Sequence, residues 1–327
     1  MVRPMSSLAN RHVLVTGGAG FLGRRVVALL EATGAVVTAP RSSEFDLTVP
    51  GAADRMLAEF QPTEIVHLAA QVGGIGYNLA QPAPLYLANL LMGTYIIEAA
   101  RHASSVTKTV LVGTVCSYPK ITPVPFAEDQ LWNGYPEESN APYGIAKKAH
   151  LIHAQVNAQQ YGQRLAYLIP TNLYGPGDKF HPSVSHVIPA LIKKCVEASE
   201  SGAEHVDVWG TGSASREYLY VDDAAQAIVR AVEADDQSGI VEPINLGADR
   251  EVTIKETVET IAQLVGFTGQ LRWDPSKPDG QPRRGVDGSR ANRLLGWQPA
   301  MNFDEGLCNT IDWYIANRAE AERDPHA

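Results

Sequence analysis

A tyrosine and a lysine four residues apart, Tyr143 and Lys147, are the residues of this sequence best suited to acid–base chemistry. Four residues span about one helical turn, so both side chains lie on one face of a helix. A free tyrosine titrates near ~10, and a lysine cation one turn away would stabilise the phenolate and lower that pKa. The pair can then transfer a proton to a reacting oxygen while the lysine also reaches a cofactor ribose. The spacing alone is common, so its surroundings decide its meaning.

A glycine-rich turn near the N-terminus supplies those surroundings. The apolar segment His12–Thr16 runs directly into three glycines at intervals of three, which open a predicted helix. Glycine is needed where such a turn takes positive φ and where backbone N–H groups approach a pyrophosphate. A strand, this turn and a helix in the first βαβ unit predict a dinucleotide site. Its expected contacts are Gly17, Gly20, Phe21, Leu22 and Gly23.

The end of the second predicted strand favours a phosphorylated cofactor. That strand ends in Ala39-Pro40-Arg41, followed by two serines, without the carboxylate that usually binds the ribose of NAD. Arg41 suits a 2′-phosphate through a charge-assisted contact, whereas the alternative is an arginine on an exposed loop. We therefore expect NADP(H), with NAD(H) still possible, and contacts from Asp46 and Leu47 to the adenine edge.

The elements that must position these residues alternate between short apolar strands and amphipathic helices, which predicts a parallel sheet. The fold class is α/β, a Rossmann-type doubly wound parallel sheet with a smaller C-terminal substrate-binding lobe. Strands are expected at His12–Thr16, Ala35–Ala39, Glu64–Leu68, Lys108–Gly113 and Arg164–Ile169. The helices between them are expected at Gly23–Thr33, Gly51–Phe60, Pro84–His102 and Tyr143–Tyr161.

The second half of the chain is less regular. Helices are expected at His186–Ser199, Asp222–Ala234 and Ile254–Val265, separated by segments rich in proline and glycine. Residues 1–172 plus about 219–247 form the predicted dinucleotide-binding domain. Residues 173–218 plus about 248–327 form the predicted lobe for the substrate.

Composition excludes several classes of function. The 327 residues carry a formal charge of −9, which argues against nucleic acid or an anionic membrane as the main partner. The 3 cysteines are widely separated and odd in number, so neither a disulfide framework nor a metal site is expected. With no signal-peptide pattern and no long apolar stretch, we expect a cytoplasmic protein.

Taken together, these motifs resemble the extended short-chain dehydrogenase/reductase superfamily over nearly the whole chain. The resemblance rests on the glycine turn, His67-Leu68-Ala69-Ala70, Asn89 and the Tyr143/Lys147 pair. It implies that the hydroxyl of Thr114 binds the reacting oxygen of the substrate. It also implies that Ala69, Lys147, Pro170, Asn172 and Leu173 contact the cofactor.

A set of longer motifs is similar to those of the GDP-L-fucose synthase family. They are Val72-Gly73-Gly74-Ile75, Cys116 before Tyr118-Pro119-Lys120, Pro170–Pro176, Ser185–Leu191, Val208-Trp209-Gly210 and Lys277-Pro278-Asp279-Gly280. Members of that family epimerise C3 and C5 of GDP-4-keto-6-deoxy-D-mannose and then reduce C4. The resemblance implies a GDP-sugar substrate.

The resemblance also implies roles for two further residues. Protons at C3 and C5 are acidic because each carbon adjoins the C4 ketone, so inversion needs a base and an acid on opposite faces. The resemblance assigns Cys116 as the base and His186 as the acid, with Tyr143 stabilising the enolate and later protonating O4. Without the family, Cys116 would be read as a buried apolar residue and His186 as an ordinary residue at a helix N-terminus.

The implied substrate site lies mainly in the second half. Arg216 matches the arginine that meets the sugar diphosphate, and Trp209 is either a stacking face or part of the core. Two positions depart from the family, since Thr114 stands where serine is usual and Lys194 where arginine is common. The remaining expected contacts are Asn172, Val187, Leu191 and Lys277.

Two other functions remain open from the sequence. A nucleotide-sugar 4-epimerase acting on a hexose or heptose without net redox change would need Tyr143 and Lys147, but would have no reason to keep both Cys116 and His186. A dinucleotide-binding sensor without catalysis would not need the tyrosine–lysine pair. A homodimer is expected through the helices at Pro84–His102 and Tyr143–Tyr161.

Overall fold

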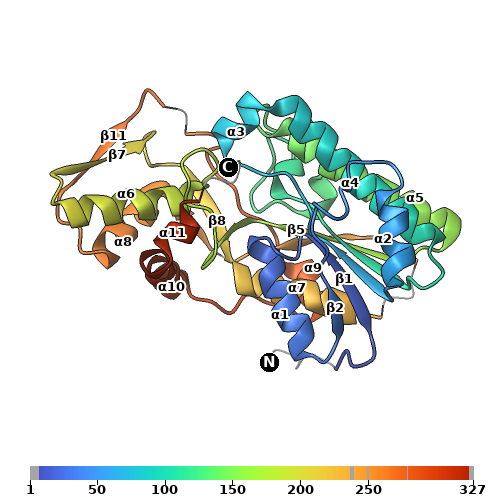
Figure 1. Cartoon of the computed structure of the whole chain (residues 1–327). Coiled ribbons are helices and arrows are strands. Elements are labelled where there is room, and N and C mark those ends of the chain that lie inside the picture. The colour runs from blue at the N-terminus through green and yellow to red at the C-terminus, as the bar shows by residue number, and fades with distance from the viewer. Residues whose placement is uncertain (1–6, 236–238, 249, 278, 324–327) are drawn as a thin grey trace.

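A parallel six-stranded sheet forms the centre of the computed structural model, which describes residues 7–235, 239–248, 250–277 and 279–323 (Figure 1). Pro278, part of one family motif, lies outside these residues. The strand order is β2-β1-β3-β4-β5-β9, which confirms the doubly wound α/β class. The strands are β1 (His12–Thr16), β2 (Val36–Thr38), β3 (Glu64–His67), β4 (Lys108–Val112), β5 (Leu165–Pro170) and β9 (Pro243–Leu246).

Helices cover both faces of this sheet because its strands are apolar on both sides. In β1, Val13 and Val15 pack in one cluster with Val26 of α1 (Phe21–Ala32). Leu14 points to the other face and packs in a second cluster with Met56 of α2 (Ala52–Phe60). The face with Leu14 is also covered by α4 (Pro82–His102) and α5 (Ala141–Tyr161). The face with Val13 and Val15 is also covered by α7 (Val221–Glu233). After β1 the chain passes to one face of the sheet, and after the neighbouring β3 it passes to the other. A crevice for a ligand therefore opens at the carboxyl ends of these two strands.

The second lobe lies beside this sheet and has its own apolar core (Figure 1). Its buried side chains include Ile192, Val208 and Leu307, and the rings of Phe180 and Tyr314 stack at a centroid distance of 4.4 Å. It contains the three-stranded sheet β10-β8-β6 and the parallel pair β11-β7. Its elements are β6 (Asn172–Tyr174), α6 (Val187–Ser201), β7 (His205–Trp209), β8 (Ser215–Tyr220), β10 (Glu251–Thr253), α8 (Ile254–Leu264), β11 (Gln270–Asp274), α10 (Phe303–Ala316) and α11 (Arg318–Ala321).

The chain returns to the first lobe through α7 and β9. The buried side chains of α7 pack in the cluster that holds α1, and β9 pairs in parallel with β5. The observed α9 (Ser289–Leu295) also packs there through Ala291. The predicted domain limits stay a prediction, but these contacts follow the expected path of the chain.

The expected helix at Pro84 begins at Pro82, because proline is tolerated in the first turn. The short elements α3 (Ile75–Ala80), η1 (Val115–Ser117) and η2 (Glu128–Gln130) were not expected. Segments of this length are too short to show a helical repeat of apolar residues. The strands from β6 onward and the helices α9, α10 and α11 were not expected either, although α10 has 14 residues. Across the described ranges, no helix has the length and apolarity needed to cross a membrane.

Candidate active site

The glycine turn is packed too closely to admit any side chain at two positions. Gly17 has φ of +72°, and a Cβ there would lie 2.7 Å from the backbone nitrogen of Ala69. A Cβ on Gly23 would lie 2.1 Å from the carbonyl oxygen of Gly17. Gly20 caps α1, and no side chain of the described residues caps its first turn. The first amide N–H groups of α1, at Phe21 and Leu22, are thus left for an anion such as a pyrophosphate.

The tip of β2 contains a carboxylate that the sequence pattern did not indicate. Oε2 of Glu44 accepts a hydrogen bond of 2.7 Å from the backbone N–H of Arg41, whose side chain is exposed. Asp46 is held by Thr48, whose backbone N–H and hydroxyl donate to Oδ1 at 2.9 and 2.7 Å, and these bonds lower its pKa. Leu47 is buried under α2, so the adenine contacts of Asp46 and Leu47 stay predictions.

Replacing Arg41 tests the cofactor preference. We expect Arg41→Ala to raise KM for NADPH by about 10- to 100-fold, the loss of one hydrogen bond to a charged group. KM for NADH should change little, because NADH lacks the 2′-phosphate. Steady-state kinetics with both cofactors measure the two KM values. Glu44→Gln removes a negative charge near Arg41 and should change KM for NADPH in the opposite direction, to a lower value. An equal loss with both cofactors would mean that Arg41 does not read the phosphate.

The start of α5 brings Tyr143 beside Cys116. A Cβ on Gly144 would lie 2.3 Å from the carbonyl oxygen of Cys116, so the helix packs directly on the backbone of η1. The hydroxyl of Ser117 donates to the carbonyl of Gly144 at 2.9 Å and fixes this contact. On the same helix, Nζ of Lys147 lies 6.0 Å from the centre of the Tyr143 ring. Helical spacing and a close backbone contact therefore gather the three side chains at the end of β4.

Thr114 holds the turn that carries Cys116. Its Oγ1 accepts a hydrogen bond of 3.2 Å from the backbone N–H of Cys116 and caps η1. In the part of the chain that the structure describes, no acceptor is recorded for the Thr114 hydroxyl proton. That proton is available to a substrate oxygen, as its predicted role requires.

The pKa of Tyr143 is shifted in the direction opposite to that expected from the sequence. Burial raises it, since a phenolate is poorly solvated there, and the nearby Cys116 thiolate raises it further. Burial also lowers the pKa of Lys147 to about 8, because only 2% of this residue is exposed. Tyr143 therefore stays protonated and is suited to donate a proton rather than to accept one.

These shifts predict a loss of activity at alkaline pH that comes from Lys147. Its cation is present below pH 8 and is lost as the pH rises through about 8, well before Tyr143 titrates. We expect kcat/KM for NADPH, which reports the free enzyme, to fall over this range. Lys147→Arg keeps its charge there, so its weaker activity should not show the fall. The same midpoint in both proteins would assign the titration to another group.

His186 is the N-cap residue of α6, where the second lobe meets the first. His186 is exposed to solvent. A Cβ on Gly74 would lie 2.7 Å from the carbonyl oxygen of Ser185, so the segment after β3 packs against the start of α6. No contact among the described residues joins His186 to Cys116, and its role as an acid stays a prediction.

Trp209 is not a core residue, because 65% of it is exposed. Nζ of Lys194 and of Lys277 lie 5.9 and 5.6 Å from its ring centre. An exposed ring flanked by two cations suits a nucleotide, whose base can stack while its phosphates are neutralised.

Arg216 is held by carbonyl groups rather than by a carboxylate. Its Nη1 donates to Ser215 and Gln281 at 2.7 Å each, and its Nη2 donates to Asp279 at 3.0 Å. A guanidinium with backbone partners retains its full charge for an anionic ligand. Of the other expected contacts, Nδ2 of Asn172 donates to the carbonyl of Glu217 at 3.1 Å. Val187 is exposed, Pro170 and Leu191 are buried, and Leu173 is half-buried.

Arg284 is a site residue that sequence reasoning missed. It is 8% exposed, and its Nη1 lies 3.8 Å from Sγ of Cys116. Its Nε and Nη2 donate to Oε1 of Gln281 at 3.0 and 2.8 Å. The one feature of the sequence that could have indicated Arg284 as a site residue is its position shortly after the Lys277–Gly280 motif.

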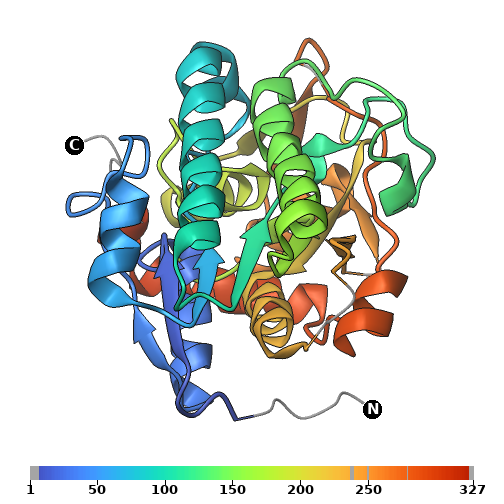
Figure 2. The same ribbon diagram turned by 90° about the vertical axis from the view of Figure 1, so that its right-hand side faces the viewer.

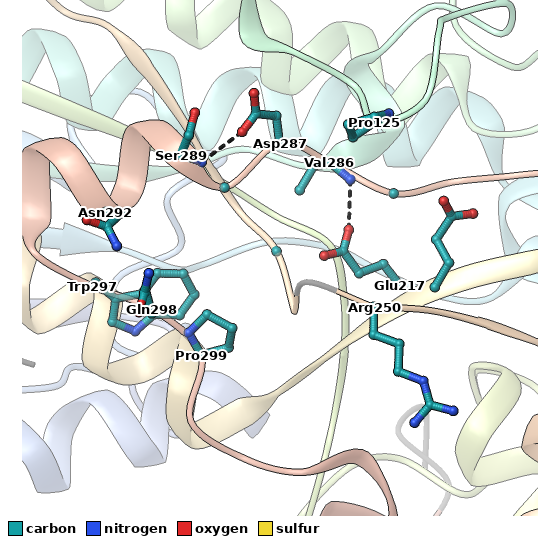
Figure 3. Close-up of a pocket in the computed structure, with 14 residues that line it drawn as sticks. Pro125, Glu217, Arg250, Val286, Asp287, Ser289, Asn292, Trp297, Gln298 and Pro299 are labelled. Carbon is teal, nitrogen blue, oxygen red and sulfur yellow. Dashed lines mark hydrogen bonds between the residues drawn. The ribbon is translucent and has the colours of Figure 1, made fainter. Parts of the chain in front are cut away.

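A cavity of about 610 Å³ borders the same segment of chain (Figure 3). Gly285 and Val286, which follow Arg284, line it, whereas none of the predicted site residues does. At its wall the buried carboxylate of Glu217 accepts a hydrogen bond of 2.7 Å from the backbone N–H of Val286. Glu217 thus fixes the strand-like segment from which Arg284 extends.

No group of three or more His, Cys, Asp or Glu side chains in the described ranges is arranged to hold a metal ion. The side chains of this site supply a thiol, a phenol, a buried amine and two guanidinium groups, of which that of Arg284 is buried and that of Arg216 half-buried. The expectation of no metal stays a prediction.

Comparisons with known proteins agree with this geometry. The model of the NAD dependent epimerase/dehydratase family matches residues 13–247. A probable GDP-L-fucose synthase 1 of Oryza sativa subsp. japonica is 41% identical over 321 residues, covering 97% of each chain. The solved GDP-L-fucose synthetase of Naegleria fowleri bound to NADP has a TM-score of 0.86 at 27% identity, covering 99% of each chain. A GDP-6-OMe-4-keto-L-xylo-heptose reductase of C. jejuni has a TM-score of 0.87 at 26% identity, covering 94% of this chain and 98% of that one.

The chain therefore belongs to the NAD dependent epimerase/dehydratase family and, within it, to the group of GDP-L-fucose synthases.

Proposed function

We propose that this chain is an NADPH-dependent 3,5-epimerase and 4-reductase that converts GDP-4-keto-6-deoxy-D-mannose to GDP-L-fucose. The observation that carries the proposal is the position of Cys116, with its sulfur 3.8 Å from Arg284 and its backbone against the helix that bears Tyr143. A reductase or a simple 4-epimerase needs Tyr143 and Lys147 but has no use for a thiol base at this point. Relatives named for GDP-L-fucose synthesis support the choice of substrate.

The epimerisation follows from the chemistry of the 4-keto group. The Cys116 thiolate removes the proton from C3 or C5, and the electron pair of the broken C–H bond moves onto O4 to give an enolate. Hydrogen bonds from Tyr143 and Thr114 stabilise that oxygen. His186 then delivers a proton to the opposite face of the carbon, which restores the ketone with inverted configuration. Once Cys116 has released its proton to water and His186 has taken one up, the same sequence at the second carbon completes the double inversion.

Reduction of C4 then uses the dinucleotide site. NADPH, when bound, supplies the hydride. The residues that would hold it are the amides at the start of α1, Arg41 at the tip of β2, and Lys147 at the ribose. Tyr143 gives its proton to O4, so the ketone becomes an alcohol. Its raised pKa suits this step, because the phenol remains protonated until the oxygen needs the proton.

A second function, reduction of a longer sugar without epimerisation, is favoured by one similar solved structure and by one residue. The heptose reductase of C. jejuni shares this fold at a TM-score of 0.87, and Thr114 adds a methyl group next to the reacting oxygen. A longer sugar without epimerisation would leave Cys116 and His186 without a task. We therefore keep the 4-keto-6-deoxyhexose as the substrate.

One experiment separates these functions. The protein is incubated with GDP-4-keto-6-deoxy-D-mannose and NADPH in deuterated water, and products are followed by NMR. Deuterium at both C3 and C5 together with stoichiometric oxidation of NADPH is expected. Oxidation without label would indicate a plain reductase. Absence of both, with cofactor already bound in the purified protein, would indicate a 4-epimerase.

We further propose that the enzyme is a cytoplasmic homodimer formed through α4 and α5. These helices lie side by side on one face of the molecule (Figure 2). Their outer surface carries apolar side chains, including Leu87, Ile152 and Val156, which are 53%, 44% and 47% exposed. Burying this surface against a second copy would remove it from water.

Charged residues on α5 test the dimer. We expect the double variant Ile152→Glu and Val156→Glu to sediment as a monomer, because burying unpaired carboxylates is costly. The parent protein should sediment as a dimer at the same concentration. Leu294→Glu on α9, at a residue 44% exposed, is the matched control and should leave the dimer intact. A monomeric parent would rule out the proposal.

A further inference from the structure

The guanidinium of Arg284 is the cation recorded in contact with the Cys116 sulfur. Nη1 lies 3.8 Å from Sγ, within the range of a charge-assisted contact to a thiolate. Two other guanidinium N–H groups are already bound to Gln281, so the side chain is fixed in direction. Gln281 is fixed in turn, since its Nε2 donates to the carbonyl of Lys120 at 2.6 Å. A chain of hydrogen bonds thus runs from the loop after η1 back to the sulfur in η1.

The backbone of Arg284 is held as firmly as its side chain. Its carbonyl accepts a hydrogen bond of 3.0 Å from the backbone N–H of Glu217. The carboxylate of Glu217 in turn accepts from Val286, two residues further on, at 2.7 Å. No carboxylate is recorded as a partner of the Arg284 guanidinium in the described part of the chain. Its charge is therefore available to the sulfur.

The other titratable and charged groups recorded around Cys116 come from two elements. Tyr143 lies on α5 and Arg216 on β8, and both interact electrostatically with the thiolate. Tyr143 is neutral, and Arg216 donates to three carbonyl groups. Desolvation lowers the pKa of Arg216, and repulsion between the two arginines lowers it further and favours anions in their neighbourhood. One such anion is the substrate diphosphate, and the other is the thiolate.

We propose that Arg284, positioned by Gln281, is the residue that holds Cys116 as a thiolate ready to act as the base. The task of the thiolate rests on the proposed function, but its charge state can be measured without turnover. The rival role for Arg284 is direct binding of the GDP-sugar, which would leave the thiol unaffected.

Alkylation by iodoacetamide reports the thiolate, because the thiolate and not the thiol is the nucleophile. The full-length protein is treated over a series of pH values, and modification of the Cys116 peptide is followed by mass spectrometry. Cys195 is buried, which raises its pKa to about 11, so it should react slowly. For Arg284→Gln we expect alkylation at pH 7 to slow by about tenfold or more, the change expected when a neighbouring cation is lost.

Three variants make the result specific to the charge at position 284. Arg284→Lys should keep much of the reactivity at neutral pH, since it restores the cation. Gln281→Met should slow alkylation by a smaller factor, since Arg284 then loses its anchor. Arg283→Gln is the matched control, because Arg283 is exposed and pairs with Glu251. It should be alkylated at the parent rate.

Identical pH profiles of Cys116 alkylation in the parent and in Arg284→Gln would overturn the proposal. Weaker binding of GDP by Arg284→Gln with an unchanged rate of alkylation would overturn it too. Thermal melting and NADPH binding show whether Arg284→Gln is folded. If it is not, alkylation of Gln281→Met at the parent rate would overturn the proposal, and so would equal slowing in Gln281→Met and Arg283→Gln. Slower alkylation in a protein that gives no deuterium exchange and no NADPH oxidation would support Arg284 while refuting the proposed function.

Discussion

Replacing Cys116 with serine is expected to abolish deuterium incorporation at C3 and C5 while C4 reduction continues. A serine hydroxyl is far too weakly acidic to be present as its anion near neutral pH, so the base is lost. General-base catalysis contributes roughly 10² to 10⁴-fold, and exchange should fall by that factor. NMR of the recovered sugar nucleotide measures the label. Oxidation of NADPH with the already epimerised 4-keto sugar measures the second step.

The separation between the two steps is the informative result. Reduction should fall no more than a few-fold, because the Cys116 backbone still packs on Gly144 and keeps Tyr143 in place. Cys308→Ser, at a half-buried cysteine on α10, is the matched control and should exchange at the parent rate. Equal loss of exchange and reduction in Cys116→Ser would show that Cys116 is not a dedicated base.

Tyr143→Phe is expected to abolish both epimerisation and reduction. The phenol serves O4 twice, first as a hydrogen-bond donor to the enolate and then as the proton donor during reduction. Removing it should lower kcat for reduction by about 10² to 10⁴-fold and should slow exchange at C3 and C5 as well. The dissociation constant for NADPH should change little, because Lys147 remains. Stopped-flow oxidation of NADPH, NMR exchange and fluorescence titration measure these three quantities.

Tyr174→Phe is the matched control for this variant. Tyr174 is buried, and the variant loses the one hydrogen bond that its hydroxyl donates to the carbonyl of Phe303 at 3.3 Å. It lies in the core of the second lobe, so any loss of stability should come without loss of chemistry. A Tyr143→Phe enzyme that still epimerises at the parent rate would leave Tyr143 with the reduction alone.

The sequence was sufficient for five of the six strands of the central sheet, all but β9, and for the catalytic helix. Periodic apolar residues place β1 at His12–Thr16, as observed, and the glycine turn follows it directly. Tyr143 and Lys147 lie on α5 as their spacing predicts. These features are local, because hydrogen bonds between near neighbours and one apolar face determine them.

Features that depend on distant contacts could not be read in this way. Arg284 reaches Cys116 across 168 residues of sequence, and bonds between distant segments, such as those of Glu217 with Arg284 and of Gln281 with Lys120, bring them together. The direction of the Tyr143 pKa shift depends on the desolvation of its phenol by the folded chain, which spacing does not reveal. For the same reason Trp209 could be either core or surface until its exposure was known.

The contact between Arg284 and Cys116 also has a consequence for synthesis on the ribosome. The chain emerges from its N-terminus, so the glycine turn, Cys116, Tyr143 and Lys147 appear long before Arg284. The nascent chain can assemble its cofactor-binding half while the thiol still lacks its cation. Only when the segment around Arg284 has been released does the cysteine gain its partner, so the full reactivity that we propose for it follows the assembly of that half.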